Sequence, residues 1–242
     1  MVISTLPTPG QTGIRQGKEM NTGAFLIEKN FFDDNEVKSI AELALSLEQK
    51  KSSVHEGGKY KDIQWHKVDL DPAHTPFAAK IYDFLGAEKN GICVFYYLSP
   101  GAVLHPHRDL TGASSNARLR FHVPIITNDN VFFNVSKERV VMSPGELWAL
   151  DTSFLHEVKN ESPHTRVHIV IECQVSEAVK RHLPRKNIFG RIHDLYFVAI
   201  LAFSFLKAIL INIWKDPKYF MAQMHMLKKF IAWRVFGKKN VK

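Results

Sequence analysis

The part of this 242-residue chain that most restricts its fold is the stretch between residues 92 and 175. It consists of short segments rich in β-branched and aromatic residues, separated by turn signals built from Pro, Gly, Asn and Ser. The segments read ICVFYYL, LRFHVPI, NVFFNV, RVVM, GELWALD and RVHIVIECQV. Closely spaced strands of this kind are typical of an all-β sandwich or barrel, so we expect the centre of the chain to be mainly β.

Two helical patterns precede the predicted strands. Residues 31–51 carry an apolar stripe behind Asp33 and Asp34, either of which is suited to capping a helix. Residues 74–86 place Thr75 at the N-cap, a proline at the first helical position and a glycine after the end. We therefore expect flanking helices on a mainly β domain.

The chain is expected to divide into three parts. Residues 1–20 are polar, lack the apolar core of a secretory signal and are predicted to form a disordered lead-in. Residues 21–178 are predicted to form the β domain with its N-terminal helices, and residues 179–242 a basic, apolar helical region. Within the β domain, residues 56–62 (EGGKYKD) are predicted to form a mobile loop.

The chain has only two cysteines, Cys93 and Cys173, and neither belongs to a CxxC pair. This excludes a disulfide framework and argues against a zinc site made of thiolates. Few cysteines are typical of a reducing compartment, so we expect a cytoplasmic location.

The predicted strands separate polar from apolar side chains. Residues two apart in a strand share a face, so Arg120 and His122 lie on one face of LRFHV. In TRVHIVIEC, Arg166 and His168 likewise share a face, with apolar residues on the opposite face. A polar face of this kind is either exposed to solvent or lines a cavity.

A set of three side chains is suited to binding a metal ion. His107 and Asp109 form an HxD pair, and His156 follows on a later predicted strand. Two imidazoles and one carboxylate are the ligands of a facial triad, which binds Fe(II) and leaves positions open for a cosubstrate and O2. Arg166, ten residues beyond His156, is placed to pair with the far carboxylate of a 2-oxo acid.

The order and spacing of these motifs carry a family resemblance. The chain offers PHRD, RLRFH, GELWALD and HEV, followed by Arg166, over about residues 92–175. In this region it resembles the aspartyl/asparaginyl β-hydroxylases, a family of Fe(II)- and 2-oxoglutarate-dependent dioxygenases, and also the bacterial proline hydroxylases. The resemblance implies a double-stranded β-helix, the jelly roll of cupin-like proteins.

The resemblance also implies roles for individual residues. The three candidate ligands match the iron ligands of the family, which also makes them the catalytic residues. Arg166 matches the arginine that pairs with 2-oxoglutarate, while Arg120 and His122 match an RxH pair that helps to hold this cosubstrate. Asp109 makes the triad complete, which argues against a halogenase, because that enzyme needs the position empty for chloride.

Some neighbouring residues keep two interpretations. His105 is either a further ligand or a loop residue, and His168 is either a ligand or part of a polar wall. Trp65 belongs either to the edge of the substrate site or to an ordinary strand. Tyr96 is a poor match to a position that contacts the cosubstrate in some family members, and Asp151 is expected to brace the turn before His156.

The C-terminal region differs from the rest of the chain in charge. The formal net charge is +8 overall, but residues 180–242 alone carry 14 Lys and Arg against two Asp, a net +12. Residues 195–214 are almost wholly apolar and long enough to span a membrane, although Lys207 opposes a span. Residues 216–239 resemble a basic helix with aromatic anchors for an anionic membrane surface.

Three alternatives stay open for residues 190–242: association with the inner face of a membrane, packing or homodimer formation, and a true membrane span. We do not expect a nucleic-acid partner, because no nucleic-acid-binding fold is recognisable.

The predicted function is the hydroxylation of an unactivated C–H bond, with Fe(II), 2-oxoglutarate and O2. The resemblance favours a small-molecule substrate or an amino-acid or peptidyl side chain. Two alternatives remain: a hydroxylase of a membrane lipid acyl chain, and a non-catalytic jelly-roll binding module held at a membrane.

Overall fold

The computed structural model describes residues 23–54, 64–109, 118–184 and 188–212, together with residues 218, 220–221 and 224–225. The predicted lead-in, the predicted loop at 56–62 and most of the predicted helix at 216–239 lie outside the described residues. The chain divides between Gly190 and Arg191 into two compact units, and each unit is described by itself.

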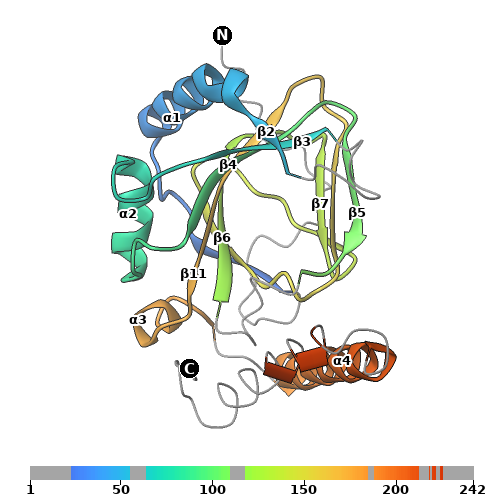
Figure 1. The fold of residues 1–242 in the computed structure, drawn as a ribbon. Coiled ribbons are helices and arrows are strands. Elements are labelled where there is room, and N and C mark those ends of the chain that lie inside the picture. The colour runs from blue at the N-terminus through green and yellow to red at the C-terminus, as the bar shows by residue number, and fades with distance from the viewer. Residues whose placement is uncertain are drawn as a thin grey trace. The chain divides into compact units, whose positions relative to one another are not determined.

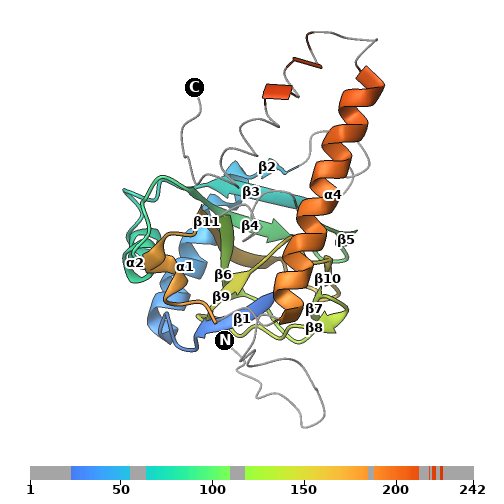
Figure 2. The ribbon, with the colours of Figure 1, turned by 90° about the horizontal axis from the view of Figure 1, so that it is seen from below.

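The first unit contains two antiparallel sheets that face each other, as the strand pattern predicted (Figure 1). Figure 2 shows the strands of the larger sheet in their spatial order. This sheet comprises β1 (Ala24–Glu28), β9 (Leu147–Leu150), β6 (Arg118–Ile126), β11 (Arg166–Gln174), β4 (Ile92–Leu98), β3 (Trp65–Asp69) and β2 (Ser52–Ser53). The smaller sheet comprises β5 (Val103–His107), β10 (His156–Asn160), β7 (Val131–Val135) and β8 (Glu138–Arg139).

Helices cover the outer face of the larger sheet (Figure 1). They are α1 (Asp34–Leu47) with a short 3-10 turn η1 (Glu48–Lys50), α2 (Pro76–Leu85) and α3 (Glu177–Lys180). Asp33 caps α1 through a capping box with Glu36, as one of the two predicted caps. Thr75 is the N-cap residue of α2, although its side chain makes no capping hydrogen bond.

Side chains alternate between the two faces of each strand, and this alternation produces two separate hydrophobic cores. The apolar face of the larger sheet packs against the helices, where Phe95, Phe121 and Ile169 are almost completely buried. A second core lies between the sheets and includes Trp148 and Phe133. The polar residues of β6 and β11 lie on the opposite face from the helix-covered core, and three of them, Arg120, His122 and Arg166, line a cavity.

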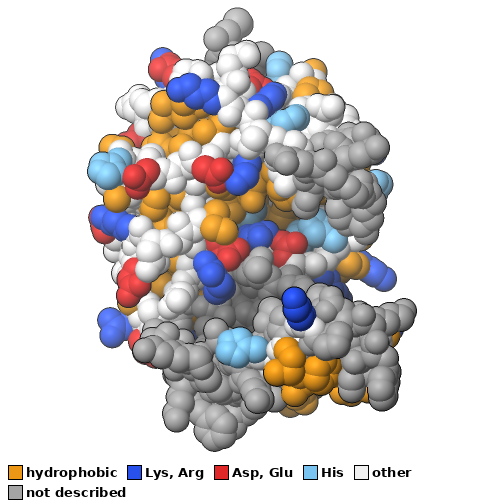
Figure 3. Space-filling view, in the orientation of Figure 1, with side chains coloured by type: hydrophobic (Ala, Val, Ile, Leu, Met, Phe, Trp, Pro, Cys, Tyr) orange, Lys and Arg blue, Asp and Glu red, His pale blue; other side chains and the backbone are white. Residues whose placement is uncertain are grey.

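Most of α4 (Ile188–Asn212) belongs to the second unit, which begins at Arg191. The helix begins seven residues before the predicted apolar tract, because the segment IFGRIHD joins it. The most apolar 18-residue window of Ile188–Ile211 has a mean hydropathy of 2.1, and this segment is long and apolar enough to cross a membrane. Figure 3 shows hydrophobic side chains gathered on the surface of this helix.

Candidate active site

The pairing of β5 with β10 brings the predicted metal ligands together. In this antiparallel pair, His107 lies directly opposite His156. Asp109 follows two residues after the end of β5, where its backbone N–H donates to the Thr152 carbonyl oxygen across 2.9 Å. Residues that are distant in the sequence thus become neighbours at one end of the smaller sheet.

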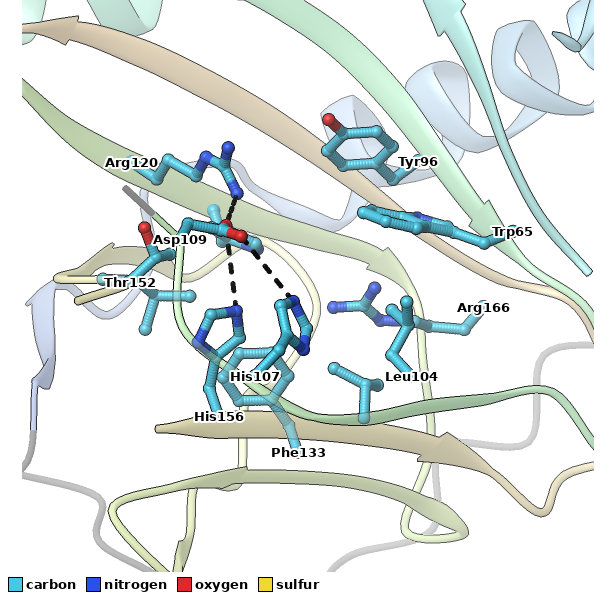
Figure 4. A pocket seen from close by; sticks show the side chains of 13 residues that line it. Trp65, Tyr96, Leu104, His107, Asp109, Arg120, Phe133, Thr152, His156 and Arg166 are labelled. Carbon is cyan, nitrogen blue, oxygen red and sulfur yellow. Dashed lines mark hydrogen bonds and ion pairs between the residues drawn. The ribbon is translucent and has the colours of Figure 1, made fainter. Parts of the chain in front are cut away.

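The three side chains point toward one another inside the cavity (Figure 4). His107 Nε2 lies 3.8 Å from Asp109 Oδ1, and His156 Nε2 lies 3.9 Å from Asp109 Oδ2. One ligand atom from each residue lies within 4.8 Å of the other two. Neighbouring donors around one metal ion are about 3 Å apart, so a small contraction would bring these atoms onto a common ion.

Both imidazoles are held by the backbone of their own chain segments. His107 Nδ1 lies 2.7 Å from the His105 carbonyl oxygen, and His156 Nδ1 lies 3.0 Å from the Phe154 carbonyl oxygen. Because a carbonyl oxygen only accepts hydrogen bonds, each Nδ1 carries the proton and each Nε2 keeps its lone pair for a metal. Burial, together with the neighbouring His107, lowers the pKa of His156 to about 4, which keeps this ring neutral. The donor set therefore fits Fe(II).

Arg166 occupies another part of the cavity wall, on β11. It is only 3% exposed, and its Nη2 donates to His168 Nδ1 across 2.8 Å. Its guanidinium lies 5.9 Å from the centre of the Phe133 ring. No carboxylate of the described residues forms an ion pair with it, and burial lowers the pKa of Arg166 to about 9. A buried cation in this state is suited to binding an anionic ligand.

Two further histidines lie near Arg166. His122 lines the cavity, and the His122 and His168 ring centres are 5.9 Å apart. Burial, with a smaller contribution from the charge of Arg166, lowers the pKa of both imidazoles well below its ordinary value. Among the described residues, His122 Nδ1 and His168 Nε2 are buried polar atoms without a hydrogen-bond partner. His122 thus offers an unused polar atom beside the cavity.

Arg120 links the candidate metal site to a second carboxylate. Its Nη1 donates to Asp109 Oδ2, and its Nε donates to Glu172 Oε2 across 3.1 Å. The sequence predicted a cosubstrate-binding role for Arg120, and that role stays a prediction. Glu172 was not predicted as a site residue. The available signal was a single acidic residue in the apolar strand RVHIVIECQ, on the same face as Arg166.

The remaining cavity wall is largely apolar. Trp65 and Tyr96 form an aromatic pair with ring centres 5.0 Å apart (Figure 4). The other apolar side chains of the wall are Leu104, Phe133, Leu150 and Val158. Trp65 therefore belongs to the cavity and not to an ordinary strand face.

Two neighbours of the ligands have supporting positions. His105 is exposed and contributes its backbone carbonyl to His107, while its ring is outside the metal-binding group formed by the described residues. Asp151 accepts hydrogen bonds from the backbone N–H of Ser153 at 3.1 Å and from the Ser153 hydroxyl. It braces the turn before His156, as predicted.

The family model described as aspartyl/asparaginyl beta-hydroxylase matches residues 35–175, and this range contains all of the candidate site residues. The chain belongs to this family. No curated protein matches the sequence of this β-hydroxylase family member.

Several solved structures resemble this family member at low sequence identity. The epimerase SnoN, in a complex with Fe3+, alpha ketoglutarate and nogalamycin RO, has a TM-score of 0.50 and 10% identity over 64% of this chain and 79% of its own. A prolyl hydroxylase from Trichoplax adhaerens has a TM-score of 0.49 and 13% identity over 66% and 87% of the two chains. A prolyl-4-hydroxylase from Pseudomonas putida has a TM-score of 0.47 and 14% identity over 64% and 94%.

The fold and the cofactors follow from these findings. The likeness to SnoN establishes the fold, which is the expected double-stranded β-helix with flanking helices. As a member of the β-hydroxylase family with a His–Asp–His group, the protein is an Fe(II)- and 2-oxoglutarate-dependent dioxygenase. It is thus an enzyme and not a non-catalytic binding module.

Proposed function

We propose that His107, Asp109 and His156 bind the catalytic Fe(II), and that Arg166 binds the distal carboxylate of 2-oxoglutarate. The observation that carries this proposal is the burial of Arg166, which lines the same cavity as the three ligands and lacks a carboxylate partner among the described residues. Burying a cation without an anion is costly, and a dianionic cosubstrate supplies that anion.

The other polar residues of the wall complete the proposed cosubstrate site. His122 has a neutral ring and an unused Nδ1, and Arg120 lies beside Asp109, so both are placed to contact a molecule bound at the metal. When bound, the iron supplies the activation of O2, which protein side chains cannot provide. The apolar wall around Trp65 and Phe133 limits the access of water to the reacting centre.

The proposed reaction is the hydroxylation of an unactivated C–H bond in an amino-acid or peptidyl side chain. Its substrate class rests on the family description. Trp65 and Tyr96 form the part of the wall that faces the candidate ligands across the cavity (Figure 4). These aromatic rings are placed to contact the apolar part of a substrate side chain.

Binding and turnover test this assignment separately. In the absence of oxygen, we expect metal-free protein to bind Fe(II) and 2-oxoglutarate with a visible charge-transfer absorption that requires both. In air, it should convert 2-oxoglutarate to succinate. His107→Ala and Asp109→Ala should abolish the absorption and succinate formation, whereas His105→Ala should retain both, because only the backbone of His105 contacts the site. Failure of the wild-type protein to bind either compound would contradict the proposal.

A lipid acyl chain is a second candidate substrate, favoured by one specific observation. The helix α4 exposes many large hydrophobic side chains, and only 14% of its most apolar window is buried. These exposed residues include Leu195, Phe203, Leu206 and Leu210. We propose that α4 and the basic residues after it associate with the cytoplasmic face of an anionic membrane, which would present lipid to the enzyme.

Flotation with liposomes tests the membrane proposal. The full chain should float with vesicles that contain anionic lipid, and less protein should float with purely zwitterionic vesicles or at high salt. A double variant, Leu206→Ser with Leu210→Ser, should weaken binding to both kinds of vesicle. If the wild-type protein fails to float at low salt, the membrane proposal is wrong, and sedimentation as a dimer would favour self-association instead.

A further inference from the structure

Glu172 is a buried carboxylate that lies close to the candidate metal centre without touching it. It belongs to β11 and is 2% exposed. In the pairing of β11 with β6, Glu172 lies directly opposite Arg120. It therefore shares the inner face of the sheet with the residues that line the cavity.

Two arginines neutralise this carboxylate, one at each oxygen. Arg118 Nε lies 3.0 Å from Glu172 Oε1, and Arg120 Nε donates to Glu172 Oε2 across 3.1 Å. Arg118 is 42% exposed in its side chain, whereas Arg120 is 17% exposed. The ion pair between Arg120 and Glu172 is therefore more shielded from solvent than the one between Arg118 and Glu172. Arg120 is also the arginine that contacts a candidate metal ligand.

Arg120 extends the arrangement to Asp109. Its Nε is occupied by Glu172, and its Nη1 donates to Asp109 Oδ2. A guanidinium is rigid and planar, so fixing Nε also fixes the direction of Nη1. The same Asp109 oxygen lies 3.9 Å from His156 Nε2, which means that the guanidinium contacts the carboxylate at its metal-facing end.

We propose that Glu172 is a positioning residue for the metal centre, acting through Arg120 on the orientation of Asp109. This inference rests on the proposed function of Asp109 as an iron ligand. Without the charge of Glu172, Arg120 loses the ion pair at its Nε and is expected to pair more closely with Asp109, which lowers the availability of that carboxylate to a metal. Partners that orient metal ligands in this way affect metal affinity by about 10- to 100-fold.

The test measures metal binding directly, with Co(II) as an anaerobic probe followed by its visible absorption. Glu172→Gln preserves the shape of the side chain and removes its charge, and we expect it to weaken Co(II) binding by at least about tenfold. Glu146→Gln is the matched control, because Glu146 is also buried and binds Trp148 Nε1 and the Ser143 N–H instead of an arginine. This control should keep the Co(II) affinity within about twofold, whatever it does to stability.

A double variant tests whether Glu172 acts through Arg120. In an Arg120→Gln background, the further change Glu172→Gln should weaken Co(II) binding by less than about twofold, because the connection is already broken. An undiminished loss in that background would overturn the proposal, as would wild-type affinity in a folded Glu172→Gln protein. If Glu172→Gln does not fold, Glu172→Asp keeps the charge but shortens the side chain by one methylene, which withdraws the carboxylate from Arg120 Nε. It should therefore show an intermediate loss of affinity, and unchanged affinity would again contradict the proposal.

The experiment also separates this inference from the proposed function. If His107→Ala leaves Co(II) binding intact, the ligand assignment itself is wrong. If His107→Ala abolishes binding while Glu172→Gln and Glu172→Asp do not alter it, only the role of Glu172 is wrong.

Discussion

Arg166 and His168 lie two residues apart on β11 and form a buried hydrogen-bonded pair, with Arg166 Nη2 donating to His168 Nδ1 across 2.8 Å. This hydrogen bond fixes one edge of the Arg166 guanidinium, and Arg166 also lines the cavity. Because His168 uses Nδ1 to accept this bond, it is placed as a support for Arg166. It lies outside the metal-binding group formed by the described residues.

The first prediction concerns the change Arg166→Lys. A lysine keeps the charge but lacks the planar fork, so it cannot bond to His168 and to a carboxylate in the same geometry. We expect the KM for 2-oxoglutarate to rise by at least about tenfold, equivalent to about 1.4 kcal/mol, with a smaller change in Co(II) affinity. The measurement is succinate formation at saturating Fe(II) over a range of 2-oxoglutarate concentrations. An unchanged KM would exclude Arg166 from cosubstrate binding.

The second prediction concerns His168→Leu. This change removes the acceptor from a buried charged donor, and an unsatisfied buried donor costs about 1–3 kcal/mol or more. We expect the free energy of unfolding in urea to fall by about that amount and the KM for 2-oxoglutarate to rise. His105→Ala serves as the control, because its exposed side chain should contribute less than about 0.5 kcal/mol. If KM stays constant while stability falls, His168 supports the fold without orienting Arg166.

The third prediction concerns the turn before β9, in the GELWALD motif. Gly145 has a φ of +80°, and a Cβ atom added there would lie 2.5 Å from the Phe32 carbonyl oxygen. Gly101 has a similar φ of +76° but has open space around it, which makes it a matched control. The free energy of unfolding of Gly101→Ala should fall by about 1 kcal/mol, because alanine is strained at a positive φ. The free energy of unfolding of Gly145→Ala, measured in urea, should fall by at least about 1 kcal/mol more, because its Cβ also clashes with the Phe32 carbonyl oxygen.

The fourth prediction concerns the reactivity of the two cysteines. Burial raises the pKa of Cys93 to about 12, and burial likewise raises the pKa of Cys173 to about 12. Only the thiolate reacts readily, so both should resist a thiol reagent such as DTNB in the native protein at pH 8. In urea, two equivalents of thiol should react per chain. Rapid modification of the native protein would show that the core around these cysteines opens frequently.

The candidate iron ligands and Arg166 could be proposed from the sequence because their spacing is tied to a known order of motifs. The structure places these residues around one cavity. The flanking helices were also predictable, since caps such as Asp33 act within a few residues of the chain. A helix cap is predictable because the capping residue and the helix it caps are adjacent in the sequence. The candidate ligands are far apart in the sequence, and there the known order of motifs indicates that they lie close together in the fold.

The contacts that were not predictable depend on which strands are neighbours. Glu172 gains its significance from the register of β11 against β6, which places it opposite Arg120. Trp65 reaches the cavity because β3 pairs with β4, where it lies opposite Leu98. Neither pairing is encoded in the periodicity of a single strand. The same limitation applies to Arg120, whose partners come from two different segments.

His107 pairs directly with His156 across β5 and β10, so the candidate metal site depends on the alignment of these two strands. Side chains alternate along a strand, so a slip of one residue would turn one imidazole to the opposite face and separate the two candidate ligands. If these residues bind iron as proposed, only the native register holds the ion tightly, and metal binding stabilises that register over a slipped one.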